Sequence, residues 1–178
     1  LVAIRSSYKN EDQYLNSNAG KYKSSLNVDT RSKNKIIQSI NLTLNSYENK
    51  KKSHFFVQDM VNNVKLSGVC LTKSLNNSLP VIEINYSENS NTDQVTSGKS
   101  NTKSLSYFPN NRFKIKDLHF LNLMKEVRRL EKIFKNEYLD IEFAIDKKEK
   151  IYILQVRPLI AKKNYLNNKL SHKVLNKL

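Results

Sequence analysis

The sequence predicts an α+β fold in which helices pack on a mostly antiparallel sheet. Two segments have the three-to-four-residue period of amphipathic helices, and several short apolar runs between them are typical of strands. Two of these runs, 140–145 and 151–156, flank the polar turn 146–150. Because strands joined by so short a turn pair antiparallel, these residues predict a β-hairpin.

The first half of the chain contains one predicted helix. Residues 1–4 form a short apolar run, which we expect to be a strand that ends at Arg5. Asp29 or Thr30 can cap a helix whose apolar residues recur at helical spacing, and lysines at 50–52 follow, where the helix dipole favours cations. Three further strand-like runs lie at residues 55–61, 68–72 and 81–86.

The second half contains a polar segment and the clearest helix. Residues 87–103 are rich in Asn, Ser and Thr, and we expect a loop. Apolar residues recur along one stripe from Asp117 to about Phe134, which predicts an amphipathic helix with a core-facing side. In the strand before this segment, Glu83 and Asn85 alternate with apolar residues and are expected on the opposite face from them.

Composition limits the classes of function. The net charge is +15, and a basic chain attracts polyanions. Only six of the 31 basic residues are Arg, however, and Tyr and Phe do not alternate with basic residues as stacking platforms, so nucleic-acid binding is not expected as the main role. The chain lacks the run of about 18 apolar residues that a membrane-spanning helix needs. A single cysteine, Cys70, excludes an internal disulfide and suits a reducing, cytoplasmic location.

Glycine is rare, which makes its positions informative. Three glycines are present, at positions 20, 68 and 98, whereas average usage of about 7% would give roughly a dozen. A chain so poor in glycine is expected to keep it where a positive φ or a close backbone approach is needed. Gly20 follows a polar run and suits a turn whose amides face a phosphate, although an ordinary turn glycine explains it equally well.

The predicted hairpin carries the most chemistry. Period-2 geometry places Asp140 and Glu142 on one face of the first strand, opposite a core-facing apolar side. Gln155 and Arg157 likewise share a face of the second strand. Two carboxylates and an amide oxygen make a set that suits Mg²⁺, and a guanidinium offers a bidentate fork for phosphate. The alternative is a solvated strand face with salt bridges.

Three segments together resemble one family. They are "AIRSSYKNEDQYLNSNAGKYKSSLNV", "VQDMVNNVKLSGVCLT" and "DIEFAIDKKEKIYILQVRPL". In this order they resemble signatures of the ATP-grasp nucleotide-binding domain of phosphoenolpyruvate synthase and pyruvate phosphate dikinase, a family that includes rifampicin phosphotransferases and glutamine kinases. The resemblance covers residues 1–160 and implies a partial ATP-grasp domain with ATP and Mg²⁺ as cofactors.

The resemblance also implies roles for residues of the first two segments. Arg5 resembles the arginine that contacts the nucleotide phosphates, and Gly20 resembles the glycine of the phosphate loop. Ser24 falls where a small hydroxyl residue touches the phosphates. Gln58, with the backbone at Met60, resembles the strand that borders the adenine.

In the third segment, the resemblance implies that Asp140, Glu142 and Gln155 are the ligands of Mg²⁺-ATP. Arg157 resembles a second phosphate contact, so that Arg5 and Arg157 are the expected catalytic residues. The chain departs from the family pattern where a glycine-rich loop is expected, since residues 87–93 read "SENSNTD". The usual Asp-Pro after "SGVxxT" is replaced by Lys73-Ser74.

The family resemblance implies phosphoryl donation from Mg²⁺-ATP. In the family, phosphate passes through a carrier histidine on another domain to a small-molecule acceptor, which is pyruvate, a hydroxyl group or an amide such as that of glutamine. We expect residues 1–160 to be the ATP-grasp domain without its N-terminal lobe, and residues 161–178 to be a linker towards the downstream phosphohistidine and acceptor domains. The alternative function is a non-catalytic or polyanion-binding module that keeps the ATP-grasp scaffold.

Overall fold

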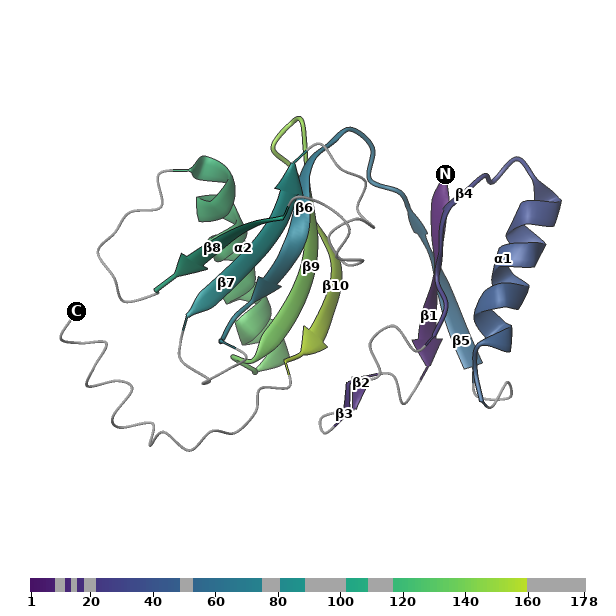
Figure 1. Cartoon of the computed structure of the whole chain (residues 1–178), viewed down its shortest axis with the longest axis horizontal. Helices are drawn as coiled ribbons and strands as arrows, with labels where there is room; N and C mark the ends of the chain where they lie inside the picture. Colours follow the sequence, from purple (N-terminus) through teal and green to yellow (C-terminus); the bar gives the residue numbers. More distant parts are fainter. Residues whose placement is uncertain are drawn as a thin grey trace. The chain divides into compact units, whose positions relative to one another are not determined.

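The computed structural model describes residues 1–8, 12–13, 16–17, 22–48, 53–74, 81–88, 102–108 and 117–159. The chain divides into two compact units, residues 1–62 and 63–178 (Figure 1). In its described part, each unit has an antiparallel sheet of at least three strands and one α-helix. The α+β fold predicted from the sequence is therefore confirmed.

The first unit is built on a three-stranded sheet with the order β4-β1-β5. Its strands are β1 (Val2–Tyr8), β4 (Ser25–Val28) and β5 (Ser53–Asp59); the short strands β2 (Asp12–Gln13) and β3 (Asn16–Ser17) form a separate pair. The strand predicted to end at Arg5 continues to Tyr8, so that prediction is wrong. The reason is that Ser6, Ser7 and Tyr8 keep pairing with β5, and Arg5 consequently lies in the middle of β1, opposite Phe56.

Helix α1 (Lys33–Asn45) follows β4 and begins slightly later than predicted. The cap is Ser32, whose Oγ accepts a hydrogen bond from the amide of Lys35, and neither Asp29 nor Thr30 takes this role. Asp29 is held by the guanidinium of Arg31 instead, which lowers the pKa of Asp29 to about 2. After the helix, the Tyr47 hydroxyl accepts from the amide of Ser7 (3.0 Å) and donates to the carbonyl of His54 (2.6 Å).

The second unit contains a five-stranded sheet with the order β10-β9-β6-β7-β8, in which all neighbours are antiparallel. Its strands are β6 (Val64–Leu71), β7 (Ile82–Glu88), β8 (Lys103–Tyr107), β9 (Leu139–Asp146) and β10 (Ile151–Pro158). The predicted hairpin at the end of the chain is confirmed as β9–β10. The loop predicted for residues 87–103 is wrong at both ends, since β7 continues to Glu88 and β8 begins at Lys103; residues 89–101 lie outside the described residues. Strand β8 was not predicted, because its short, serine-rich sequence lies at the edge of the sheet, where alternate side chains stay exposed.

Helix α2 (Leu118–Phe134) covers one face of this larger sheet (Figure 1). The predicted helix is confirmed, and Asp117 caps it by accepting a hydrogen bond from the amide of His119. Its apolar stripe packs on side chains of the central strands; the fully buried members of this core include Leu123, Val127, Ile84, Ile141, Phe143 and Ile145. Burial of this stripe against the sheet is the main source of the unit's stability.

The close packing around Gly68 explains why β6 has a glycine at this position. It lies between Tyr86 on β7 and Phe143 on β9, and the Tyr86 ring packs edge-on against Phe120 of α2 at 4.9 Å between centroids. A β-carbon on residue 68 would collide with the backbone oxygen of Asn85 and would lie 2.9 Å from the Tyr86 Cα. The prediction from rarity, that glycine is kept for a close backbone approach, is confirmed at this position.

We therefore expect Gly68→Ala to destabilise the second unit, since backbone atoms cannot move aside as easily as a side chain. Overpacking of this kind costs roughly 1–3 kcal/mol. Chemical denaturation followed by circular dichroism measures the loss. Ser106→Ala, an exposed change on β8, is the matched control and should stay within about 0.5 kcal/mol of the wild type. Equal stability of Gly68→Ala and wild type would contradict the prediction.

Candidate functional site

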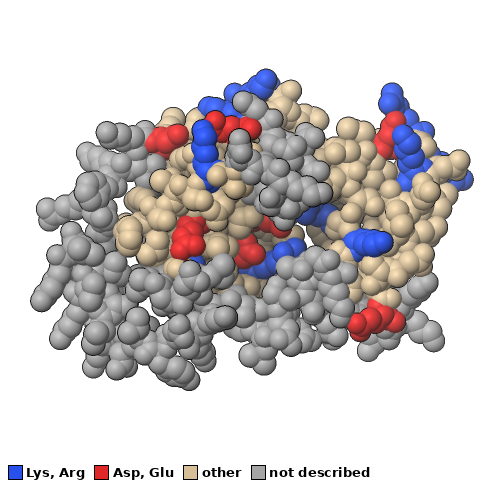
Figure 2. All heavy atoms as spheres, viewed as in Figure 1, with Lys and Arg blue, Asp and Glu red and all other residues tan. Residues whose placement is uncertain are grey.

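The face of the larger sheet opposite α2 carries polar side chains from β7, β8, β9 and β10, and β6 contributes Val69 and Leu71 between them. Along each strand these side chains alternate with the core-facing residues, so they share one face. The register between neighbouring strands aligns them in rows across the sheet. One row contains Ser104, Asn85, Val69, Glu142 and Gln155, and the next contains Ser106, Glu83, Leu71, Asp140 and Arg157. Figure 2 shows acidic and basic side chains next to one another on the visible side of this unit. We call these two rows the polar face.

A β-bulge in β10 determines which residues of the hairpin share the polar face. Ile153 pairs with Phe143, but the next pair is Gln155 with Glu142, which leaves Leu154 as the extra residue. Ile153 and Val156 pack against the core, whereas Leu154 is not part of it. The bulge therefore places Gln155 directly opposite Glu142, and two residues further along Arg157 lies opposite Asp140.

The four predicted hairpin residues thus form two cross-strand pairs on one face. The Arg157 guanidinium also lies diagonally towards Glu142, with 3.9 Å between Nη1 and Oε1. Both side chains are largely buried, with 18% and 15% of their surface exposed. Water screens such a pair less than it screens an exposed one, so the arginine offsets the repulsion between the two neighbouring carboxylates.

The described residues hold no group of three or more His, Cys, Asp and Glu side chains that could bind a metal ion. The set predicted from the sequence consists of two carboxylates and one amide, so it contains only two side chains of these four types. Carboxylate and amide oxygens are among the donors that Mg²⁺ takes in proteins.

The first unit holds the other predicted nucleotide-binding residues. Gln58 pairs with Ala3 and Arg5 lies two residues beyond Ala3, so the register places Arg5 and Gln58 on the same face of the smaller sheet. The Ser24 hydroxyl accepts a hydrogen bond from the amide of Ser6 at 3.3 Å. This bond holds Ser24 next to the residue that follows Arg5 in the chain.

Met60 and Gly20 are the two remaining residues of the first unit that were predicted to contact the nucleotide. The amide of Met60 donates to the carbonyl of Leu1 at 3.1 Å, so this donor serves the sheet. Gly20 lies outside the described residues.

The polar face also contains residues that were not predicted to form the site, among them Asn85 and Glu83. Asn85 accepts a hydrogen bond from the Ser104 hydroxyl at 2.7 Å, and Glu83 lies in the same row as Asp140. Alternation along 81–86 already indicated that Glu83 and Asn85 share a face, and the structure confirms it. That this face is also the face of Asp140 and Glu142 depends on β6 lying between β7 and β9, which local sequence does not reveal.

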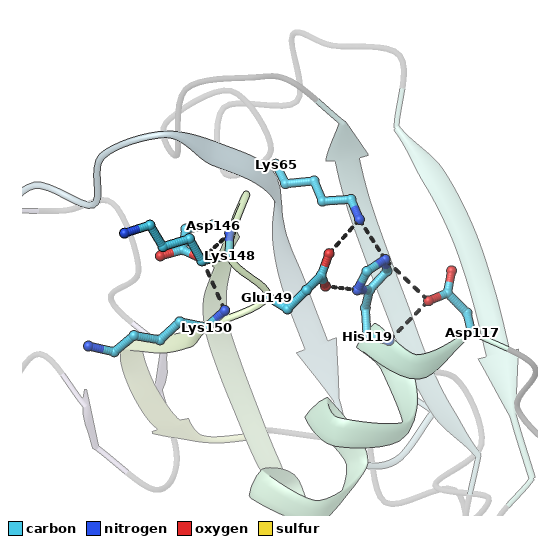
Figure 3. Close-up of polar contacts among 7 residues, drawn as sticks. All are labelled: Lys65, Asp117, His119, Asp146, Lys148, Glu149 and Lys150. Carbon is cyan, nitrogen blue, oxygen red and sulfur yellow. Dashed lines mark hydrogen bonds and ion pairs between the residues drawn. The ribbon is translucent and has the colours of Figure 1, made fainter.

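The turn of the hairpin is held by a network of charged groups, drawn in Figure 3. Lys65 of β6 donates to Glu149 (2.7 Å) and lies 2.8 Å from Nε2 of His119, while Nδ1 of His119 faces the second Glu149 oxygen. Because an ammonium group can only donate, Nε2 of His119 accepts and Nδ1 carries the proton. The network therefore connects β6, the start of α2 and the hairpin turn.

The comparison with known families identifies the chain. Residues 73–174, more than half of the chain, match the family model of the pyruvate phosphate dikinase AMP/ATP-binding domain. The protein belongs to this family, as the resemblance implied, and the matched residues are an AMP/ATP-binding domain of that type. The matched residues include the whole β9–β10 hairpin; Arg5, Ser24, Gln58 and Met60 precede them.

No curated protein matches the chain. Across the residues that the structure describes, neither helix has the combination of length and apolar character that crossing a membrane requires.

The Glu149 network predicts a pH-dependent contribution to stability. Hydrogen bonding from Lys65, together with the nearby His119, lowers the pKa of Glu149 below 4.5. Its contribution is therefore fully present above pH 4.5 and is lost as the pH falls through the lowered pKa of the folded state. Glu149→Gln should have a lower melting temperature than the wild type at pH 7, and the difference should shrink below pH 4.5.

Thermal melts of both proteins from about pH 3 to about pH 8 measure the difference in melting temperature on both sides of the ordinary pKa of a glutamate. Glu126→Gln, which removes a carboxylate from an exposed pair on α2, is the control. A difference between wild type and Glu149→Gln that grows towards acid pH would contradict the assignment.

Proposed function

We propose that this domain binds Mg²⁺-ATP and donates a phosphoryl group as part of a phosphotransferase of the pyruvate phosphate dikinase type. The register of the β9–β10 hairpin is the observation that carries the proposal. It aligns two carboxylates, an amide and a guanidinium on one largely buried face, within the segment that matches the family model. A solvated strand face gives no reason for burying this combination.

In this proposal, Asp140, Glu142 and Gln155 hold the metal through oxygen atoms. Bound Mg²⁺ supplies positive charge that neutralises the phosphate oxygens. Arg157 binds a phosphate oxygen through its planar fork and stabilises the charge that develops on the transferring group. These residues position the nucleotide and contribute electrostatic stabilisation, and no covalent intermediate on this chain is required.

Residues of the first unit receive separate roles. Arg5 contacts the phosphates as the second catalytic arginine, with Ser24 and Gly20 as further phosphate contacts. Gln58 and the backbone at Met60 border the adenine. The shared face of Arg5 and Gln58 on β1 and β5 supports this assignment, because both can then reach one ligand.

The proposal extends to the phosphoryl acceptor. The phosphate would pass to a carrier histidine on another domain and then to a small molecule, such as pyruvate, a hydroxyl compound or glutamine. Residues 1–160 would then be the nucleotide-binding part and residues 161–178 the linker, in a cytoplasmic enzyme. This chain alone would bind nucleotide without completing turnover.

Calorimetric titration of the chain with ATP, with and without Mg²⁺, tests the proposal. We expect binding that Mg²⁺ strengthens. Glu142→Gln should weaken Mg²⁺-ATP binding by about ten- to a hundred-fold, since a charge-assisted contact is worth roughly 1.5–3 kcal/mol. Glu126→Gln on α2 is the matched control and should bind like the wild type. Salt-sensitive DNA binding that ATP does not compete away would favour the polyanion-binding alternative.

Arg5 provides an independent test in the first unit. Arg5→Lys keeps the charge but loses the planar fork, so ATP affinity should fall by about ten-fold or more if both arms contact phosphate. Arg31→Lys, at an exposed arginine that pairs with Asp29, is the control. A lower melting temperature with unchanged ATP affinity would show that Arg5 serves the sheet and not the ligand.

A further inference from the structure

We infer that Arg157 exchanges partners during ligand binding: it offsets part of the negative charge of Asp140 and Glu142 in the ligand-free domain and turns to the phosphates when metal and nucleotide bind. This inference rests on the proposed function and deepens it, because it assigns a regulatory device to the same site. Arg157 would act as a built-in cation that occupies the carboxylates until the metal replaces it.

The register places two carboxylates within reach of the Arg157 guanidinium. Asp140 is its direct partner across the β9–β10 pair, and Glu142 lies on the diagonal with 3.9 Å between Nη1 and Oε1. Directly opposed and diagonal residues on one face are within reach of a long side chain. Since the guanidinium has five N–H donors in a fixed fork, it can turn from carboxylate to phosphate oxygens with the same geometry.

Charge explains why the partners must change. The hairpin places two carboxylates and one guanidinium together, a local net charge of about −1 if all are ionised. A divalent cation at the same carboxylates would stand close to the guanidinium, and like charges in a largely buried place repel strongly. The phosphates of the nucleotide remove this conflict, because they give the guanidinium an alternative acceptor. Metal and nucleotide are therefore expected to bind cooperatively.

The inference predicts effects of opposite sign from one substitution. Arg157→Gln removes the competing cation, so the affinity for a divalent metal ion alone should rise. The same variant loses its contact with phosphate, so the affinity for ATP without metal should fall. We expect about ten-fold in each direction, which corresponds to about 1.4 kcal/mol. A residue that only stabilises the fold would weaken both.

Arg157→Lys separates charge from shape. Lysine keeps a cation beside the carboxylates, so metal affinity should stay within about three-fold of the wild type, whereas the loss of the fork should weaken ATP binding. The matched control is Arg129→Gln, which makes the same change at an arginine that pairs with Glu126 on α2 and is 71% exposed. This control should leave both affinities unchanged.

The experiment uses all 178 residues of the chain, with Mn²⁺ as the probe. Loss of the electron paramagnetic resonance signal of free Mn²⁺ reports metal binding without nucleotide, and calorimetry with ATP in the presence of a chelator reports nucleotide binding without metal. Melting temperatures of all variants verify that each is folded. Tighter Mn²⁺ binding by Arg157→Gln, with weaker ATP binding, supports the exchange.

Other results overturn the inference and separate it from the proposed function. Unchanged or weaker Mn²⁺ binding by a folded Arg157→Gln, or no Mn²⁺ binding by any variant, overturns the exchange; if the wild type still binds ATP, the proposed function survives. If Arg157→Gln is unfolded, the decision passes to Arg157→Lys, and wild-type ATP affinity in that variant overturns the exchange. A wild type that binds neither ATP nor Mg²⁺-ATP overturns the proposed function itself.

Discussion

The pairing of β9 with its two neighbours is the constraint on which the site depends. Ile141, Phe143 and Ile145 are fully buried under α2, so the residues between them must face the other way. A slip of one residue would move Glu142 into the apolar core, which makes the register strongly specified. The core therefore fixes the orientation of the carboxylates, although it does not touch the polar face.

Both ends of β9 are tied to β6, which keeps this arrangement rigid. At one end, Lys65 holds Glu149 beyond the hairpin turn. At the other, the Thr72 hydroxyl donates to the carbonyl of Glu137 (2.6 Å) and accepts from the amide of Leu139 (2.8 Å). Lys73 pairs with Glu137 and lies over the Tyr138 ring, so it contacts the same junction.

The sequence predicted what local periodicity determines. The helix that ends at Phe134, the β9–β10 hairpin and the shared face of Asp140 and Glu142 all follow from the spacing of apolar residues. It did not predict features that depend on partners distant in the chain. The continuation of β1 past Arg5 depends on β5, and the shared face of Glu83 and Asp140 depends on β6 lying between β7 and β9.

The local charge of the polar face separates the two candidate functions. The whole chain carries +15, which favours any polyanion. On the described polar face, however, Glu83, Asp140 and Glu142 outnumber the single guanidinium of Arg157. A bare polyanion would meet repulsion there, whereas a phosphate that arrives with a divalent cation would be attracted by the same carboxylates. This face is therefore better suited to a metal-bound nucleotide than to nucleic acid, despite the basic character of the chain as a whole.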